Sequence, residues 1–221
     1  MLFRSMELVC KGRQKKMKDK WTEYKQLLKD NNIPDWYIDS CDKIKYMFPK
    51  AHATAYVSAA WRIAWYKINR PIEYYACFFS IKCFAFDLEA MEMGYDKIKE
   101  RLTELKLKKF GLTVKEQDLI TTLEVAMEMT ARGYKFGSVD LEKSDSKNFV
   151  IDNDTLIPPF RAIDGLGDVV AQNIVEERNQ KNFISIEELQ KRCKISQTLI
   201  EKMEIMGILK NLPKSSQLSL F

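Results

Sequence analysis

The chain has 221 residues, of which 46% are hydrophobic and 30% charged, and its formal net charge is +5 at pH 7. These values allow a buried core in one large domain or two small ones, and the mild positive charge permits a nucleic-acid partner without requiring one. A secretory signal, a membrane span and a zinc site are not expected, because residues 1–20 are charged throughout, no apolar run is long enough, and the five cysteines form no C-x-x-C pair. Such scattered cysteines favour a reduced cytoplasmic location.

The first half of the chain is predicted to be helical. Its apolar residues recur at helical spacing, and prolines or glycines stand at the segment ends. The small apolar residues of 51–68 favour a buried helix, and Asp87, Glu89 and Glu92 fit a solvated helix face better than a metal cluster. The predicted helices span 21–28, 34–46, 51–68, a segment that starts at Pro71, 87–107, and a segment from the capping box Thr113–Glu116 to a stop at Gly133.

After Gly133 the apolar period changes to that of strands. Residues 139–141 and 149–151 are predicted strands, and Asp152-Asn153-Asp154 is the predicted turn before residues 156–157. Asp and Asn are expected in such a turn for backbone reasons, so Asp152 and Asp154 are not taken as a metal pair. Helices are predicted again over 168–178, 186–191 and 197–206, with a second capping box at Ser185–Glu188 and a stop at Gly207.

A glycine-rich turn precedes the helix predicted from Asp168. Residues 163–175 carry an h-x-G-h-G-x-x-x-A-x-x-I pattern, which resembles a helix-hairpin-helix DNA-binding element. Its backbone amides and the following helix N-terminus can bind a DNA phosphate without reading a base, so Gly165, Leu166 and Gly167 are candidate DNA-binding residues. Asp168 argues against this, because an acid repels phosphate unless it caps the helix, and a helix corner without a ligand is the alternative.

A second unit, 194–206, lacks the Gly-h-Gly turn. We expect it to pack against the first unit and not to form a second DNA-binding site.

Two further segments carry candidate binding residues. Phe48, Lys50 and His52 stand at the start of a predicted helix, where they suit phosphate and base contacts, although from the residues alone an ordinary helix start with a satisfied histidine is the better explanation. The last five residues, Gln217-Leu218-Ser219-Leu220-Phe221, resemble the Q-L-x-L-F peptide that binds the bacterial sliding clamp. Their apolar side chains would fill the clamp groove; a tail folded back onto its own domain is the alternative.

Taken in order, these segments resemble one family. Residues 33–41, the Phe-Pro-Lys-Ala-His segment, Leu156-Ile157-Pro158-Pro159-Phe160, the hairpin and the Q-L-S-L-F end are similar to the PolC-type DNA polymerase III alpha subunit of low-GC Gram-positive bacteria. The resemblance implies a mainly α fold with a helical fingers region over 1–137, a β-hairpin connector over 138–160, a tandem helix-hairpin-helix module over 161–212 and an extended clamp-binding tail over 213–221.

The resemblance also implies roles and partners. Phe48, Lys50 and His52 would line the site of the incoming nucleotide, and Lys11, Arg13 and Arg62 are weaker candidates for DNA phosphate contacts. Cys10 stands where a basic residue is expected. The implied activity is DNA-directed DNA polymerase, with primer-template DNA, dNTP, the sliding clamp and other replisome proteins as partners and no membrane. The magnesium ions of that chemistry lie on palm aspartates outside this sequence, so we expect this chain to hold no metal and to be catalytically silent alone.

Two other classes of function stay open from the residues alone. A non-catalytic helix-hairpin-helix accessory module of repair or replication would explain the hairpin without a nucleotide site. A purely structural helical protein would show no salt-dependent DNA affinity.

Overall fold

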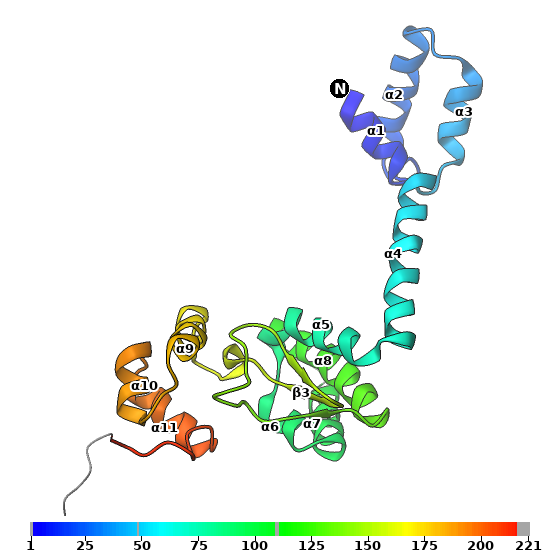
Figure 1. Ribbon diagram of the computed structural model, residues 1–221. Helices are drawn as coiled ribbons and strands as arrows, with labels where there is room; N and C mark the ends of the chain where they lie inside the picture. Colours follow the sequence, from blue (N-terminus) through cyan, green and yellow to red (C-terminus); the bar gives the residue numbers. More distant parts are fainter. Residues whose placement is uncertain (1, 48, 109–110, 216–221) are drawn as a thin grey trace, which may run out of the picture. The chain divides into compact units, whose positions relative to one another are not determined.

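The computed structural model describes residues 2–47, 49–108 and 111–215 (Figure 1). The chain divides into two compact units, residues 1–64 and 65–221, and is mainly α-helical with one small sheet, as the sequence predicts. Among the helices of the described residues, none combines the length and the hydropathy that a membrane span requires.

The first unit is helical. It contains α1 (Leu2–Cys10), α2 (Lys18–Asp30), α3 (Asp35–Lys43) and the first part of α4 (Lys50–Asn69). Leu8, Val9, Trp21 and Cys41 form its small core. The buried Gln14 side chain donates to the carbonyl oxygen of Cys41 at 2.7 Å, which fixes the end of α3 against the turn after α1.

Helix α4 differs from the expectation of a buried helix. None of its residues is buried in the described chain, and the side chains of Trp61 and Ile68 are each 74% exposed. Apolar residues surround this helix on every side, which ordinarily marks a buried helix. The sequence pattern therefore predicts a buried helix, and this prediction is wrong for α4 as it stands in the described residues.

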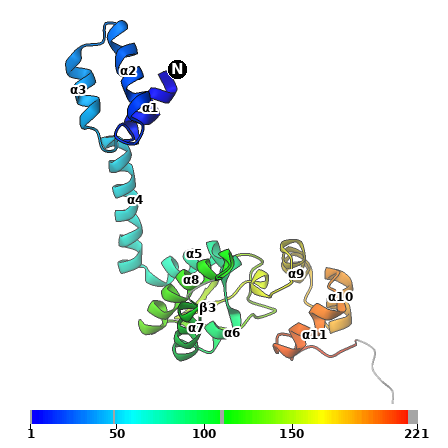
Figure 2. The same cartoon turned by 180° about the vertical axis from the view of Figure 1, so that it is seen from behind.

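The second unit begins with four helices around a sheet (Figures 1 and 2). They are α5 (Pro71–Ile81), α6 (Leu88–Glu92), α7 (Tyr95–Leu107) and α8 (Val114–Ala131), with a short 3-10 turn at Cys83–Ala85. The single helix predicted over 87–107 is wrong, because Gly94 adopts a φ of +88° and separates α6 from α7. The capping box is confirmed, since the Glu116 amide donates to Thr113 Oγ1 at 3.2 Å and the Thr113 amide donates to Glu116 Oε2 at 2.9 Å.

Three short strands complete this part of the unit. β1 (Lys135–Phe136) lies parallel to β3 (Thr155–Ile157), and β2 (Val150–Asp152) lies antiparallel to β3 on its other side. The turn between β2 and β3 is confirmed, with Asn153 at a φ of +54°. The strand predicted over 139–141 is wrong, because Asp140 Oδ1 accepts from the amides of Glu142 and Lys143 at 2.8 and 2.9 Å and holds a turn there.

The last helices share a second core. A 3-10 turn at Phe160–Ala162 leads to α9 (Asp168–Gln180), α10 (Ile186–Cys193) and α11 (Gln197–Ile205), which confirms the three helices predicted here. Gly207 follows α11 at a φ of +73°, as the predicted stop requires. The buried members of this core include Phe160, Ile163, Leu166, Ala171, Ile174, Leu189, Ile195, Ile200 and Met203.

Candidate functional site

The hairpin that precedes α9 contains two glycines, of which one has a positive φ and the other an ordinary extended conformation. Gly165 adopts a φ of +90°, a conformation that L-residues rarely adopt. Gly167 has a φ of −73° and a ψ of 157°, which any residue can adopt, and it is the N-cap of α9. Only Gly165 is therefore required by backbone geometry, while Gly167 leaves open space in front of the helix.

Leu166 anchors this hairpin from within. Its side chain is 5% exposed and packs in the second core, and its amide donates to the carbonyl oxygen of Ile163 at 3.0 Å. The structure thus places Leu166 beneath the turn. The flanking Gly165 and Gly167 are exposed, so the backbone on both sides of Leu166 is the part that a ligand can reach.

The N-terminus of α9 has no side-chain cap. The first amides of an α-helix have no intrahelical acceptor, and the helix dipole adds partial positive charge at that end. Asp168 and Val169 in this first turn are exposed, Val169 to 74%. An anion can therefore approach these amides from solvent.

Three cations surround this turn, which the sequence did not single out. Lys147 Nζ and Arg161 Nε lie 3.7 and 3.6 Å from the Asp168 carboxylate. Lys202 Nζ donates to the carbonyl oxygen of Asp164 at 2.6 Å and lies 3.7 Å from its carboxylate. These three cations lie close to the two acids at the turn, which include the Asp168 that argued against phosphate binding.

The second hairpin repeats the shape of the first without glycine. Lys194 adopts a φ of +55°, Ile195 is 4% exposed, and Ser196 is the N-cap of α11. The Ser196 hydroxyl accepts from the amide of Leu199 at 3.4 Å, so this N-terminus is already capped. Leu199 lies 3.7 Å from the point where a Cβ on Gly165 would stand, which agrees with the prediction that the second unit packs against the first.

The remaining predicted site residues fall into two groups. Lys50 and His52 are exposed in the first turn of α4, and the His52 ring lies 4.5 Å from that of Tyr56. Phe48 and the segment 217–221 lie outside the described residues.

The structure brings the turn after α1 close to the start of α4. The amide of Met47 donates to the carbonyl oxygen of Cys10 at 2.8 Å, which places the exposed Lys11 and Arg13 near the segment that leads into α4. Arg62 lies twelve residues beyond Lys50 on α4, about 18 Å along the axis at 1.5 Å per residue. Arg62 therefore does not share a site with Lys50.

The acidic residues considered as metal ligands have other partners. Asp87 accepts from the Ala90 amide and from Arg101 Nε, each at 3.1 Å, and Asp152 pairs with Lys143 at 2.7 Å. Asp87 and Glu92 are only partly exposed and Glu89 is exposed, so the predicted solvated face holds fully for Glu89 alone; burial raises the pKa of Glu92. Within 2–47, 49–108 and 111–215, no group of His, Cys, Asp and Glu fits a metal ion.

A hollow of about 860 Å³ adjoins the hairpin on one side. Its lining includes residues 164–166. Cations and acids line it in similar numbers: Arg101, Lys115, Arg161 and Lys202 against Asp87, Glu89, Glu92, Glu116 and Asp164. Because these charges nearly balance, phosphate affinity is expected at the N-terminus of α9 and not in the hollow itself.

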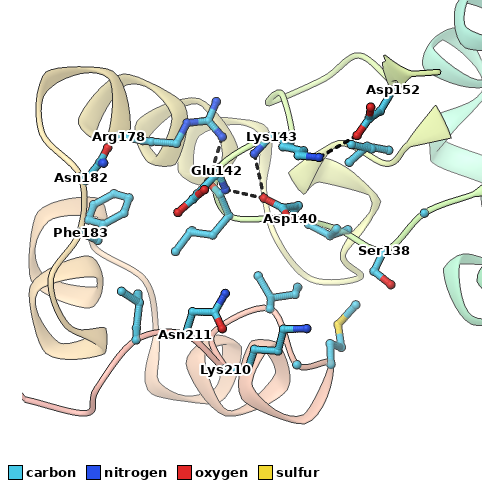
Figure 3. A pocket seen from close by; sticks show the side chains of 18 of the residues that line it. Ser138, Asp140, Glu142, Lys143, Asp152, Arg178, Asn182, Phe183, Lys210 and Asn211 are labelled. Atoms are coloured by element: carbon cyan, nitrogen blue, oxygen red, sulfur yellow. Dashed lines mark hydrogen bonds and ion pairs between the residues drawn. The ribbon is translucent and has the colours of Figure 1, made fainter. Parts of the chain in front are cut away.

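A second hollow, of about 600 Å³, separates the loop at 137–143 from the segment 206–212 (Figure 3). Arg178, on α9, lies at one wall, and Lys210 and Asn211 lie at the facing wall (Figure 3). The Arg178 guanidinium donates to the carbonyl oxygens of Leu141 and Ser144 at 2.9 and 2.8 Å, and burial lowers its pKa from the usual value. Arg178 thereby ties the loop that follows β1 to α9.

Comparison with known proteins gives two findings. The family model described as "Helix-hairpin-helix motif" matches residues 133–218, a stretch that includes both hairpins and the sheet. Over its full length the chain is 51% identical to the "DNA polymerase III PolC-type" proteins of Streptococcus sanguinis and Streptococcus suis, and 50% identical to that of Streptococcus mutans. The chain spans about 15% of the length of these relatives.

Proposed function

This chain is a homologue of a C-terminal fragment of PolC-type DNA polymerase III, and on that premise we propose that it binds primer-template DNA and docks on the sliding clamp during replication. The observation that carries the DNA part is the uncapped N-terminus of α9, next to an exposed glycine turn and three cations. The proposed setting is the bacterial cytoplasm, together with the other replisome proteins.

Phosphate binding at this site needs little rearrangement. The ion pairs of Lys147 and Arg161 with Asp168 are long, at 3.7 and 3.6 Å, and partly exposed, so each cation can turn to a DNA phosphate at small cost. The first-turn amides of α9 would contact the same phosphate or its neighbour. No base edge is read in this arrangement, which suits a polymerase that must hold any sequence.

At the other end of the chain, we propose contacts with the incoming nucleotide and template. Lys50 and His52 are two residues apart on α4, so their side chains leave the helix in different directions. They would therefore contact different groups of the nucleotide; Phe48 is proposed as a third contact from the sequence alone. Of the three weaker candidates for phosphate contacts, Lys11 and Arg13 would contact a phosphate near Lys50, and Arg62 would contact a more distant one.

Nucleotidyl transfer is proposed for the full-length polymerase only. The described residues hold no fitting metal cluster, and the magnesium ions would lie on palm residues outside this sequence. In a primer-extension assay, this chain alone is expected to incorporate no nucleotide. Incorporation by the purified chain would contradict this assignment.

A charge-matched comparison tests DNA binding. In one variant Lys147, Arg161 and Lys202 are changed to Gln; in the control, Lys97, Lys99 and Lys106 on α7 are changed to Gln. Fluorescence anisotropy with a labelled duplex should show at least a tenfold loss for the first variant and less than a twofold loss for the control. Each lost phosphate contact should also lower the salt slope by about one unit. Equal losses in both variants would refute a specific site at the hairpin.

A pull-down on immobilised sliding clamp tests the second interaction. Removal of Gln217 to Phe221 should abolish retention, because the apolar side chains that fill the clamp groove are lost. Ser219→Ala is the matched control, since the third position of the peptide carries no required side chain. Unchanged retention after the deletion would refute the role of the tail.

A further inference from the structure

The chain after α11 returns to the N-terminus of α10. The amide of Ile186 donates to the carbonyl oxygen of Pro213 at 2.9 Å, and the amide of Glu187 donates to that of Lys214 at 3.2 Å. The Ser215 hydroxyl donates to Glu187 Oε2 at 2.9 Å. We call residues 213–215 the strap, because they provide acceptors for two helix amides that otherwise have none within the helix.

The strap is continuous with the core of the helix-hairpin-helix module. Leu209 is 2% exposed and belongs to the second core, Leu212 packs against it, and the Leu212 amide donates to the Leu209 carbonyl oxygen at 2.9 Å. Ser185 Oγ accepts from the Glu188 amide at 3.1 Å and completes the cap of α10. From Leu209 to Ser215 the chain is therefore attached to the same body that carries the DNA-binding hairpin.

We propose that the strap fixes the place of the sliding clamp relative to the DNA held at α9, an inference that rests on the proposed clamp and DNA binding. One residue separates Ser215 from Gln217, so these two residues lie at most about 7 Å apart, at about 3.5 Å per residue. The proposed place of the clamp is therefore close to the N-terminus of α10. The exposed Ile184, Glu187 and Lys214 form this surface.

The connection from Ser215 to Gln217, which we call the tether, is two residue steps long, and this length has a thermodynamic consequence. When two binding elements are joined, the second binding step is intramolecular, and its effective concentration falls with about the −3/2 power of tether length once the tether exceeds the span. Lengthening the tether from two to about twelve residue steps should lower this concentration about 15-fold. The affinity of the peptide itself should not change.

Insertion of ten Gly and Ser residues after Ser215 tests the proposal in this chain. Three affinities are measured: for the clamp alone, for a duplex alone, and for the clamp loaded on primed circular DNA. We expect the first two to stay within twofold of wild type and the third to fall about 15-fold. An unchanged third affinity, with the first two intact, overturns the strap proposal while the proposed function stands. Absence of binding to the clamp alone overturns both.

Discussion

Replacing Gly167 with Asp should separate stability from DNA binding. Gly167 is the N-cap of α9, its backbone suits any residue, and an added Cβ meets nothing within 4 Å. Asp is a preferred N-cap that accepts from the first-turn amides, and its charge is favourable at that end of the helix. The two effects together should stabilise the chain by about 0.5–1 kcal/mol, which raises the melting temperature by about 1–4 °C at this length.

The same substitution should weaken DNA binding. The introduced carboxylate would occupy the amides that the phosphate needs, and two like charges about 5 Å apart repel by roughly 1 kcal/mol in water and about 3 kcal/mol near a protein surface. A loss of at least tenfold in affinity follows, because about 1.4 kcal/mol corresponds to a factor of ten. Thermal melting and fluorescence anisotropy on the same preparation measure both effects.

Two further substitutions complete this test. Gly167→Asn caps the helix without a charge and should raise the melting temperature similarly, with a smaller loss of affinity. Gly167→Ala leaves the amides open and should retain most of the affinity. If the Gly167→Asp variant binds DNA as tightly as wild type while its melting temperature rises, the N-terminus of α9 is not the phosphate site.

Three stability predictions follow from the same reasoning. Gly165→Ala should cost about 1–2 kcal/mol, seen as a lower melting temperature, because the φ of +90° strains any L-residue. An unchanged melting temperature would contradict this. Thr113→Ala should cost about 1 kcal/mol in urea unfolding through loss of the α8 cap, whereas Thr121→Ala on the exposed face of α8 should change little. The Lys108 ammonium and then the Thr113 amide lower the pKa of Glu116 to about 2, so its contribution is complete above about pH 4.5 and is lost as the pH falls toward 2. Glu116→Gln should flatten this acid limb, and equal acid sensitivity of the two proteins would show that Glu116 does not contribute.

The parts of the fold that were predicted from the sequence are those fixed by local chemistry. The capping box at Thr113 and Glu116, the turn at Asn153 and the stop at Gly207 depend on residues within four positions of one another. The hairpin was found for the same reason, since Gly165 and the apolar residues of α9 form a short continuous pattern.

The incorrect or missing predictions concern segments whose structure depends on distant residues or on a side chain that competes with the strand hydrogen bonds. β1 has two residues and is held by parallel pairing of Lys135 and Phe136 with Thr155 and Leu156, which no local pattern reveals. Residues 139–141 alternate like a strand, but the Asp140 side chain offers the backbone a turn instead.

The cations of the candidate site were missed for a related reason. Lys147, Arg161 and Lys202 are far apart in the sequence and meet only when the loop before β2, the 3-10 turn before α9 and α11 pack together. A cluster assembled by tertiary packing leaves no periodic signal. The general excess of Lys and Arg was the one available hint.

Arg178 connects α9 to the loop that follows β1. Its guanidinium holds two loop carbonyls, at Leu141 and Ser144, and three residues further on the same loop carries Lys147 toward the N-terminus of α9. A side chain near the far end of α9 thus governs where a cation stands at the opposite end of that helix. Substitutions at Arg178 should therefore weaken the proposed DNA binding although Arg178 is not part of the proposed phosphate site, and a screen limited to that site would overlook them.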